Sequence, residues 1–270
     1  MSPADALVVI PTYEESANIH EVLDRVLAAA PRVHVLVVDD NSPDGTADLV
    51  TAHPEHRSRV HLIVRPAKAG LGAAYRAGFA WALNRGYPAV VQMDADLSHP
   101  PERVPALLDA LAEYDVAVGS RYVRGGRVRN WPLPRRLISR LGNVYVGLVL
   151  QLPVRDATAG FKAFRTDALT TIGVVDSQSN GYCFQIENTW QAVRHGLRVT
   201  EVPITFTDRS RGSSKMSGAI VLEAIVRVLG WRVRNSPSLQ AWIAKTQPRT
   251  ASRTTGATVS RSSSRRSTAA

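Results

Sequence analysis

Two alternating patterns in the first 120 residues constrain the fold of this 270-residue chain more than any other feature. Short apolar runs rich in β-branched residues predict five strands, at Ala6–Ile10, Val33–Val38, Val60–Val64, Ala89–Met93 and Asp115–Val118. Between them, apolar residues recur at helical spacing, as in Ile19, Val22 and Val26. Strands alternating with helices predict an α/β fold, with a Rossmann-like, mostly parallel twisted sheet flanked by helices.

The positive charge of the chain is unevenly distributed. Lysine and arginine number 33 against 23 aspartate and glutamate, a net charge of +10. Residues 245–270 hold six basic residues and no acid among Ser, Thr and Ala, and without them the net charge is about +4. Such a composition builds no core. We therefore expect a folded domain over residues 1–244, a disordered basic tail over 245–270, and no nucleic-acid partner.

The sequence is typical of a cytoplasmic protein. Its single cysteine, Cys183, excludes an internal disulfide and suits a reducing compartment. The first residues lack the basic and apolar regions of a signal peptide. No stretch provides the ~20 apolar residues of a membrane-spanning helix.

Two later segments predict amphipathic helices, at Arg135–Leu152 and Met216–Arg234. Each combines an apolar side with several arginines, such as Arg140 and Arg227. They could be packed on the core, or they could lie on a membrane surface with arginines at the lipid phosphates. The occurrence of two such helices favours the membrane interpretation.

Polar and acidic residues gather where three of the predicted strands end. These strand ends are residues 11–15, 39–45 and 94–96. Because the carboxyl ends of parallel strands form one rim of a sheet, and ligands bind there, we expect a site at this rim. Asp94 and Asp96 are two residues apart and can present both carboxylates to one point. A hard cation such as Mg²⁺ or Mn²⁺, also bound by diphosphate oxygens, would remove their mutual repulsion.

Glycines and cations supply the second set of candidates. Gly70 and Gly72 follow a strand and open a helix, but Tyr75 stands where a dinucleotide-binding turn has its third glycine. The two glycines could instead allow a nucleotide to approach the backbone, with Lys68 supplying charge. Arg121 ends the fifth predicted strand, and residues 208–215 form a polar loop with three cations that could close over phosphates.

Together these motifs resemble a known family. Pro11-Thr-Tyr-x-Glu15, Val38-Asp-Asp40, Asp94-Ala-Asp96, Gly119-Ser-Arg-Tyr122 and Arg209-x-x-Gly-x-Ser-Lys215 occur in the order typical of family 2 inverting glycosyltransferases. Within this family the chain most resembles the dolichol-phosphate (polyprenol-phosphate) mannose synthases, from about residue 6 to 235. The resemblance implies a GT-A fold and transfer of mannose from GDP-mannose to a polyprenyl phosphate.

The resemblance also implies residue roles. The nucleotide would be held by Pro11, Tyr13, Glu15, Val38 and Asp40, and Lys68 is a further candidate from the glycine segment. The metal would be bound by Asp94 and Asp96, with Ala95 against the diphosphate. Phosphates of donor or acceptor would be bound by Arg121, Arg209 and Lys215, joined by Arg135 on the acceptor side. An anionic lipid phosphate needs no general base, which agrees with a site of acids and cations.

Two departures from the family pattern qualify the resemblance. Many relatives carry C-terminal transmembrane helices, which this sequence lacks, so we expect a peripheral protein on the cytoplasmic face, held at the membrane surface by its amphipathic helices or by an integral-membrane partner. Ser98 stands where some relatives have a Gln near the metal, which leaves the third protein ligand open.

Alternatives remain at this point. The same reaction could use another donor, such as UDP-glucose. A processive polysaccharide synthase is disfavoured because the chain has no Gln-x-x-Arg-Trp motif. A non-catalytic nucleotide-sugar sensor or a nucleic-acid binder represents a different class. The Asp94/Asp96 pair, together with Arg209 and Lys215, argues against an inactive protein.

Overall fold

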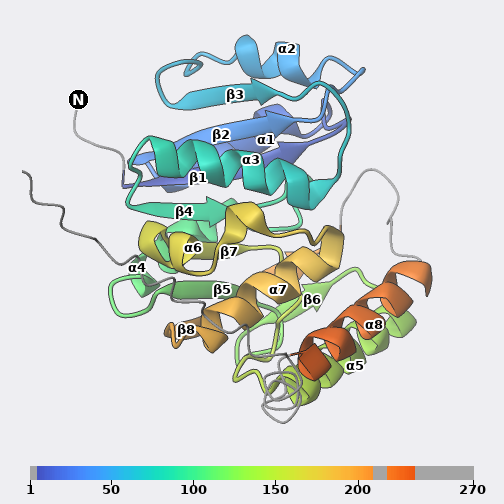
Figure 1. Cartoon of the computed structure of the whole chain (residues 1–270). Coiled ribbons are helices and arrows are strands. Elements are labelled where there is room, and N and C mark those ends of the chain that lie inside the picture. Colours follow the sequence, from blue (N-terminus) through green and yellow to red (C-terminus); the bar gives the residue numbers. More distant parts are fainter. Residues whose placement is uncertain (1–4, 209–217, 235–270) are drawn as a thin grey trace, which may run out of the picture. The chain divides into compact units, whose positions relative to one another are not determined.

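A computed structural model describes residues 5–208 and 218–234 of the chain. Its main sheet has the strand order β3-β2-β1-β4-β7-β5-β8 (Figure 1). These strands are β1 (Ala6–Thr12), β2 (Val33–Asp39), β3 (Val60–Val64), β4 (Ala89–Gln92), β5 (Val116–Ser120), β7 (Lys162–Arg165) and β8 (Val199–Pro203). Neighbouring strands are parallel except at β7, which runs antiparallel to β4 and to β5. The predicted mostly parallel α/β sheet is confirmed.

The five predicted strands all form, with ends within two residues of the expected ones. The sequence analysis missed β7 and β8. Strand β7 has only four residues, Lys162-Ala-Phe-Arg165, and two of them carry charge. A short strand with this composition has no apolar run to reveal it, and only its pairing with β4 and β5 makes it a strand.

Helices cover both faces of the sheet (Figure 1). One face is covered by α1 (Ile19–Ala29), α2 (Thr46–Thr51) and α4 (Val104–Ala110), and the other by α3 (Leu71–Asn84), α6 (Thr166–Thr171) and α7 (Gly181–Arg194). Successive side chains of a strand point to opposite faces. Accordingly, Val8 of β1 packs into the first core and Val9 into the second. Two 3₁₀ turns, Pro101–Arg103 and Val174–Asp176, complete these connections.

Helices α5 (Leu133–Leu150) and α8 (Gly218–Arg234) lie side by side and form a third cluster with α7 (Figure 1). In this cluster Trp190 of α7 stacks on Trp231 of α8, with ring centroids 5.5 Å apart. The outward side of the pair is apolar as well, because Leu137, Leu141 and Leu148 of α5 are exposed. The predicted amphipathic helices are thus helical where described, but this apolar stripe does not face the core.

The strands β6 (Arg127–Arg129) and β9 (Thr205–Thr207) form a separate two-stranded parallel sheet. In the chain, β6 is followed by α5, and β9 is followed by residues 209–217. The chain divides into two units, Met1–Arg232 and Val233–Ala270. The expected boundary at residues 244 and 245 lies outside the described residues. Within the described part, no helix combines the length and apolar character needed to cross a bilayer.

Candidate active site

The polar strand ends meet on one rim, because β2, β1 and β4 are adjacent and parallel. A non-glycine residue with positive φ follows each strand: Glu14 at 60°, Asn41 at 58° and Leu97 at 60°. Such backbone conformations are disfavoured, and they persist where the surroundings enforce them, often at functional sites. Three of them on one rim support the expectation of a site there.

Asp39, at the end of β2, ties two of the rim segments together. Its buried carboxylate accepts hydrogen bonds from the Thr12 hydroxyl (2.7 Å), the Ser42 amide (2.8 Å) and the Ser42 hydroxyl (2.6 Å). The Ser42 hydroxyl oxygen in turn accepts the Glu14 amide at 3.0 Å. The end of β1 is therefore fixed against the loop that follows β2.

Asp40, a predicted nucleotide residue, binds the neighbouring loop in the structure. Its carboxylate accepts hydrogen bonds from Arg65 Nη1 (2.6 Å) and from the Ala69 amide (3.1 Å). These bonds hold the segment that carries Lys68, whose ammonium lies 3.4 Å from the centre of the Tyr13 ring. Two further predicted residues, Lys68 and Tyr13, are thus brought together at the rim.

The other predicted nucleotide residues differ in exposure. Pro11 and Glu15 are half-buried at the end of β1 and beyond it. Val38 is fully buried and packs in the core beneath α3. Its side chain is therefore part of the core, and its backbone is buried between β1 and β3.

Asp94 and Asp96 follow β4 and lie at the centre of the rim. Asp94 Oδ1 accepts the Tyr75 hydroxyl at 3.0 Å, and its side chain is 33% exposed. Asp96 is buried and accepts the Ser98 amide at 3.1 Å through Oδ1. The Ser98 hydroxyl is buried and has no hydrogen-bond partner among the described residues.

This donor set fits a hard dication. Carboxylate and hydroxyl oxygens suit Mg²⁺ or Mn²⁺, which commonly take one or two carboxylates and complete their coordination with water and phosphate oxygens. The buried Ser98 hydroxyl is an oxygen donor left without a protein partner. Among the described residues no group of three or more His, Cys, Asp or Glu side chains could hold a metal. A metal here would therefore complete its coordination with water or substrate oxygens.

Tyr75, which in the sequence stands only where a glycine is missing, is a further residue of the candidate site. Burial and the Asp94 carboxylate raise the pKa of Tyr75 well above its ordinary value. Its hydroxyl therefore remains a hydrogen-bond donor to Asp94 throughout the physiological range. Gly72, one turn earlier, is explained by packing, since a Cβ there would lie 2.6 Å from the Ser179 carbonyl oxygen.

Arg121, a predicted phosphate ligand, is buried in an ion pair. Its Nε and Nη2 donate to the two carboxylate oxygens of Asp156, at 2.8 and 2.6 Å, and Nη2 also reaches the Thr158 hydroxyl at 2.8 Å. Burial lowers the pKa of Arg121, but the Asp156 carboxylate more than offsets this, so the net shift is upward. The guanidinium is a permanent positive charge in a fixed orientation.

Arg135 lies near Arg121 in a similar arrangement. Its Nη1 donates to both carboxylate oxygens of Asp208, at 2.9 and 3.0 Å, and its guanidinium lies 4.2 Å from the centre of the Trp131 ring. The Arg135 Nε and the Trp131 indole nitrogen are buried without partners among the described residues. Arg209 and Lys215 lie outside the described residues.

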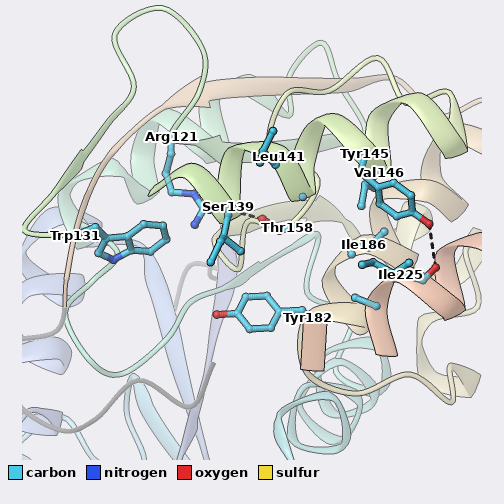
Figure 2. A pocket seen from close by; sticks show the side chains of 13 residues that line it. Arg121, Trp131, Ser139, Leu141, Tyr145, Val146, Thr158, Tyr182, Ile186 and Ile225 are labelled. Atoms are coloured by element: carbon cyan, nitrogen blue, oxygen red, sulfur yellow. Dashed lines mark hydrogen bonds between the residues drawn. The ribbon is translucent and has the colours of Figure 1, made fainter. Parts of the chain in front are cut away.

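An apolar cavity of about 360 Å³ opens beside Arg121, between α5, α7 and α8 (Figure 2). Its walls are mostly apolar and include Ile138, Leu141, Val146, Ile186 and Ile225. Arg121, Ser139 and Thr158 provide polar groups at one end, as Figure 2 shows. A cavity of this kind can take an apolar ligand with an anionic head.

Comparison with known proteins adds to this geometry. The model of glycosyl transferase family 2 matches residues 7–173. A polyprenol monophosphomannose synthase of Mycolicibacterium smegmatis is 51% identical over 233 residues, which cover 84% of this chain and 87% of that protein. An undecaprenyl-phosphate mannosyltransferase of Micrococcus luteus is 48% identical, over 83% of this chain and 93% of that protein.

Among solved structures, a glucosyl-3-phosphoglycerate synthase from Mycobacterium tuberculosis, in complex with Mn²⁺, UDP and glucosyl-3-phosphoglycerate, is similar in fold. The TM-score is 0.62 at 21% identity, over 85% of this chain and 80% of that one. This likeness agrees with the predicted GT-A type of α/β fold.

Proposed function

The chain belongs to glycosyl transferase family 2, and from this premise we propose that it transfers mannose from GDP-mannose to a polyprenyl (dolichyl-type) phosphate with inversion, releasing GDP. The observation that carries the acceptor assignment is the apolar cavity that ends at Arg121. A lipid phosphate combines the two properties that this cavity requires, an apolar chain and an anionic head. The polyprenyl-phosphate activities named for the two relatives support the same acceptor class.

On the donor side, we assign the nucleotide to the rim of β1 and β2. Contacts to it would come from Pro11, Tyr13, Glu15 and Asp40, with Lys68 supplying charge. Asp94, Asp96 and the hydroxyl of Ser98 would hold Mg²⁺ or Mn²⁺, and Ala95 would lie against the diphosphate. The metal would neutralise the leaving diphosphate as a Lewis acid. The Mn²⁺ and UDP of the solved neighbour support this assignment.

On the acceptor side, Arg121 and Arg135 would bind the lipid phosphate, together with Arg209 and Lys215. The anchored guanidinium of Arg121 would orient the phosphate oxygen toward the anomeric carbon of the sugar. A phosphate anion is already a nucleophile at neutral pH, so no side chain has to remove a proton. Attack from the side opposite the leaving group inverts the configuration, and fixed positions and charges lower the barrier.

The exposed stripe of α5 supports a place for the protein at a membrane surface. Leu137 and Leu148 would enter the headgroup region, and Arg136 and Arg140 of the same helix would meet lipid phosphates. This arrangement would bring the cavity to the lipid that supplies its substrate. An integral-membrane partner could add to this attachment on the cytoplasmic face.

Product formation from a short polyprenyl phosphate tests the proposal. The assay contains Mg²⁺ and, in separate reactions, GDP-mannose, UDP-glucose or UDP-N-acetylglucosamine. We expect a lipid-linked product with GDP-mannose alone. Asp96→Ala should reduce turnover by about a hundredfold or more because the metal loses a ligand, while its circular dichroism and unfolding curve stay close to wild type.

Other outcomes would change the proposal in defined ways. Turnover with a UDP-sugar would keep the mechanism and replace the donor. Normal turnover by Asp96→Ala would remove the metal assignment. No product with any donor, in the presence of membranes, would contradict the proposed reaction, and a titration with GDP and UDP would then test whether the rim binds nucleotides at all.

A further inference from the structure

His99 lies directly behind Asp94 and has no role in the reaction proposed above. Its side chain is 3% exposed. Its Nδ1 accepts a hydrogen bond from the Asp94 backbone amide at 3.1 Å. To accept this bond, Nδ1 presents its lone pair to the amide. His99 thereby fixes the backbone at the first residue of the Asp94–Asp96 pair.

The position of the imidazole ring is set by its neighbours. Phe161 stacks on it, with centroids 5.2 Å apart and planes at 14°, and Phe206 meets it edge-on at 5.5 Å and 73°. Gly160 lies against the same ring. A Cβ at Gly160 would crowd the ring at 3.2 Å from His99 Cε1 and would touch Asp94 Oδ2 at 3.4 Å, an ordinary contact distance.

The ring contacts continue from His99 to the acceptor side. Phe206 of β9 meets the Trp131 ring edge-on at 5.3 Å and 69°. Trp131 lines the apolar cavity and carries the Arg135 guanidinium on its face, 4.2 Å from the ring centre. His99, Phe206 and Trp131 therefore form one row of packed rings, which we call the ring row, from Asp94 to the cavity.

We propose that His99 is a positioning residue with two separable roles: its Nδ1 orients Asp94 for the metal, and its ring supports Phe206 and Trp131 at the acceptor cavity. This inference rests on the proposed function, because it assigns His99 to the metal and acceptor sites of that reaction. The first role depends on a hydrogen-bond acceptor and the second on an aromatic surface. Two substitutions can separate them.

His99→Phe keeps an aromatic ring and removes the acceptor. The Asp94 amide then loses its buried partner, and we expect Mn²⁺ to bind about tenfold more weakly, as a lost buried hydrogen bond implies. Binding is measured by electron paramagnetic resonance of the unbound Mn²⁺, which requires no turnover. At saturating metal, the KM for polyprenyl phosphate should stay within about twofold of wild type, since the ring row is retained.

His99→Asn keeps an acceptor, because its amide oxygen can take the place of Nδ1, and removes the ring. Here we expect Mn²⁺ affinity within about threefold of wild type and a KM for polyprenyl phosphate raised about tenfold. Phe206→Leu is a second variant for the same role, as it interrupts the ring row and leaves His99 in place. It should raise the same KM and leave Mn²⁺ binding unchanged.

The inference is overturned if His99→Phe raises the acceptor KM and His99→Asn weakens Mn²⁺ binding, or if the two variants do not differ in these effects. If folded His99→Phe and His99→Asn lose metal affinity and acceptor affinity in parallel, or lose neither, His99 has no such separable roles. If both variants unfold, an unchanged acceptor KM in Phe206→Leu overturns the ring-row role. Failure of the proposed function is recognised separately, because wild type would then form no lipid-linked product with any donor.

Discussion

At the scale of single residues, Asp94 is fixed by side chains from two other parts of the chain. Asp94 is held by the Tyr75 hydroxyl on Oδ1 and by His99 on its amide, and Gly160 leaves the space beside Oδ2 free of a side chain. These three residues come from α3, from the loop after β4 and from the turn before β7. A metal ligand held on several sides has little freedom to turn away from the metal.

Replacing Tyr75 with Phe tests this restraint. The change removes the hydroxyl that donates to Asp94 and keeps the buried ring. We expect kcat/KM to fall about tenfold and the free energy of unfolding to fall by about 1 kcal/mol, the usual net value of one hydrogen bond. Steady-state kinetics and urea unfolding measure the two effects.

Tyr87→Phe is the matched control for that experiment. Its hydroxyl lies 2.7 Å from His34 Nδ1. Tyr87 just precedes β4 and His34 is near the start of β2, so the pair lies at the amino ends of the strands, opposite the rim of the candidate site. We expect a similar loss of stability and normal kcat/KM. Equal losses of activity in the two variants would show that Tyr75 acts only through general stability.

Lys162 makes a second prediction at this scale, which concerns pH. It is fully buried in β7, and its ammonium donates to the Gln185 carbonyl oxygen at 2.6 Å. Burial lowers the pKa of Lys162 from 10.5 to about 7, although Asp156 acts in the opposite direction. Between these two values the unfolded chain binds the proton and the native protein does not.

The free energy of unfolding should therefore rise with pH from about 7 toward 10.5, because the unfolded state binds more protons in that interval. Urea unfolding at several pH values between neutrality and pH 9.5 measures this rise. Lys162→Met should remove it, and Lys68→Met, which changes an exposed lysine, should retain it. An unchanged slope in Lys162→Met would show that another group is responsible.

At the scale of elements, α5 is the helix with the most unusual surface. Its inner residues, such as Val146 and Leu150, pack against α7 and α8, while Leu137 and Leu148 are exposed outside the cavity. Soluble helices normally place polar residues on the outer face. An exposed apolar stripe of this kind marks a surface for interaction with a membrane or with another protein.

The substitution Leu148→Glu tests whether the apolar stripe of α5 binds a membrane. Leu148 is 75% exposed and does not line the cavity. We expect binding to vesicles with anionic lipid to weaken about tenfold, because a charge replaces an apolar group that enters the headgroup region. Activity on a short, soluble acceptor should stay normal. Cosedimentation with vesicles measures the binding.

The control for this experiment is Val64→Glu. Val64 is also apolar and exposed, at 52%, but belongs to β3 at the edge of the main sheet. The same charge added there should leave vesicle binding unchanged. If both variants weaken binding equally, the effect belongs to net charge and not to the stripe on α5.

At the scale of the whole molecule, the strand-end residues and the cavity all belong to the unit Met1–Arg232. Residues 246–270 contribute mainly basic charge in the sequence. Their removal should leave turnover of a soluble acceptor within about twofold of wild type. Binding to anionic vesicles should weaken and lose part of its salt dependence, since each basic residue near such a surface contributes about 1 kcal/mol.

Activity with the soluble acceptor and vesicle binding at low and high salt measure the two expectations for this truncated chain. A collapse of soluble-acceptor activity would instead make these residues part of the site. Unchanged vesicle binding would remove them from membrane attachment and leave the helices as the attachment surface.

The acidic residues at the strand ends were predictable from the sequence, but the residues that hydrogen-bond to them were not. Asp94 and Asp96 were predictable because an apolar strand leads into two carboxylates. Tyr75 and His99 were not, because a lone tyrosine in a helix and a histidine before two prolines have many ordinary explanations. Arg121 was predicted as a phosphate ligand, and its pairing with Asp156, 35 residues away, could be seen only in the fold.

The sequence by itself determined the α/β class, the five strands of the first 120 residues and the acidic strand ends, because these depend on local periodicity and on the order of residues along the chain. Tertiary structure decided the insertion of β7 between β4 and β5, the hydrogen bonds of Tyr75 and His99 to Asp94, and the exposure of the apolar side of α5. These features depend on contacts between distant segments, which no local pattern encodes.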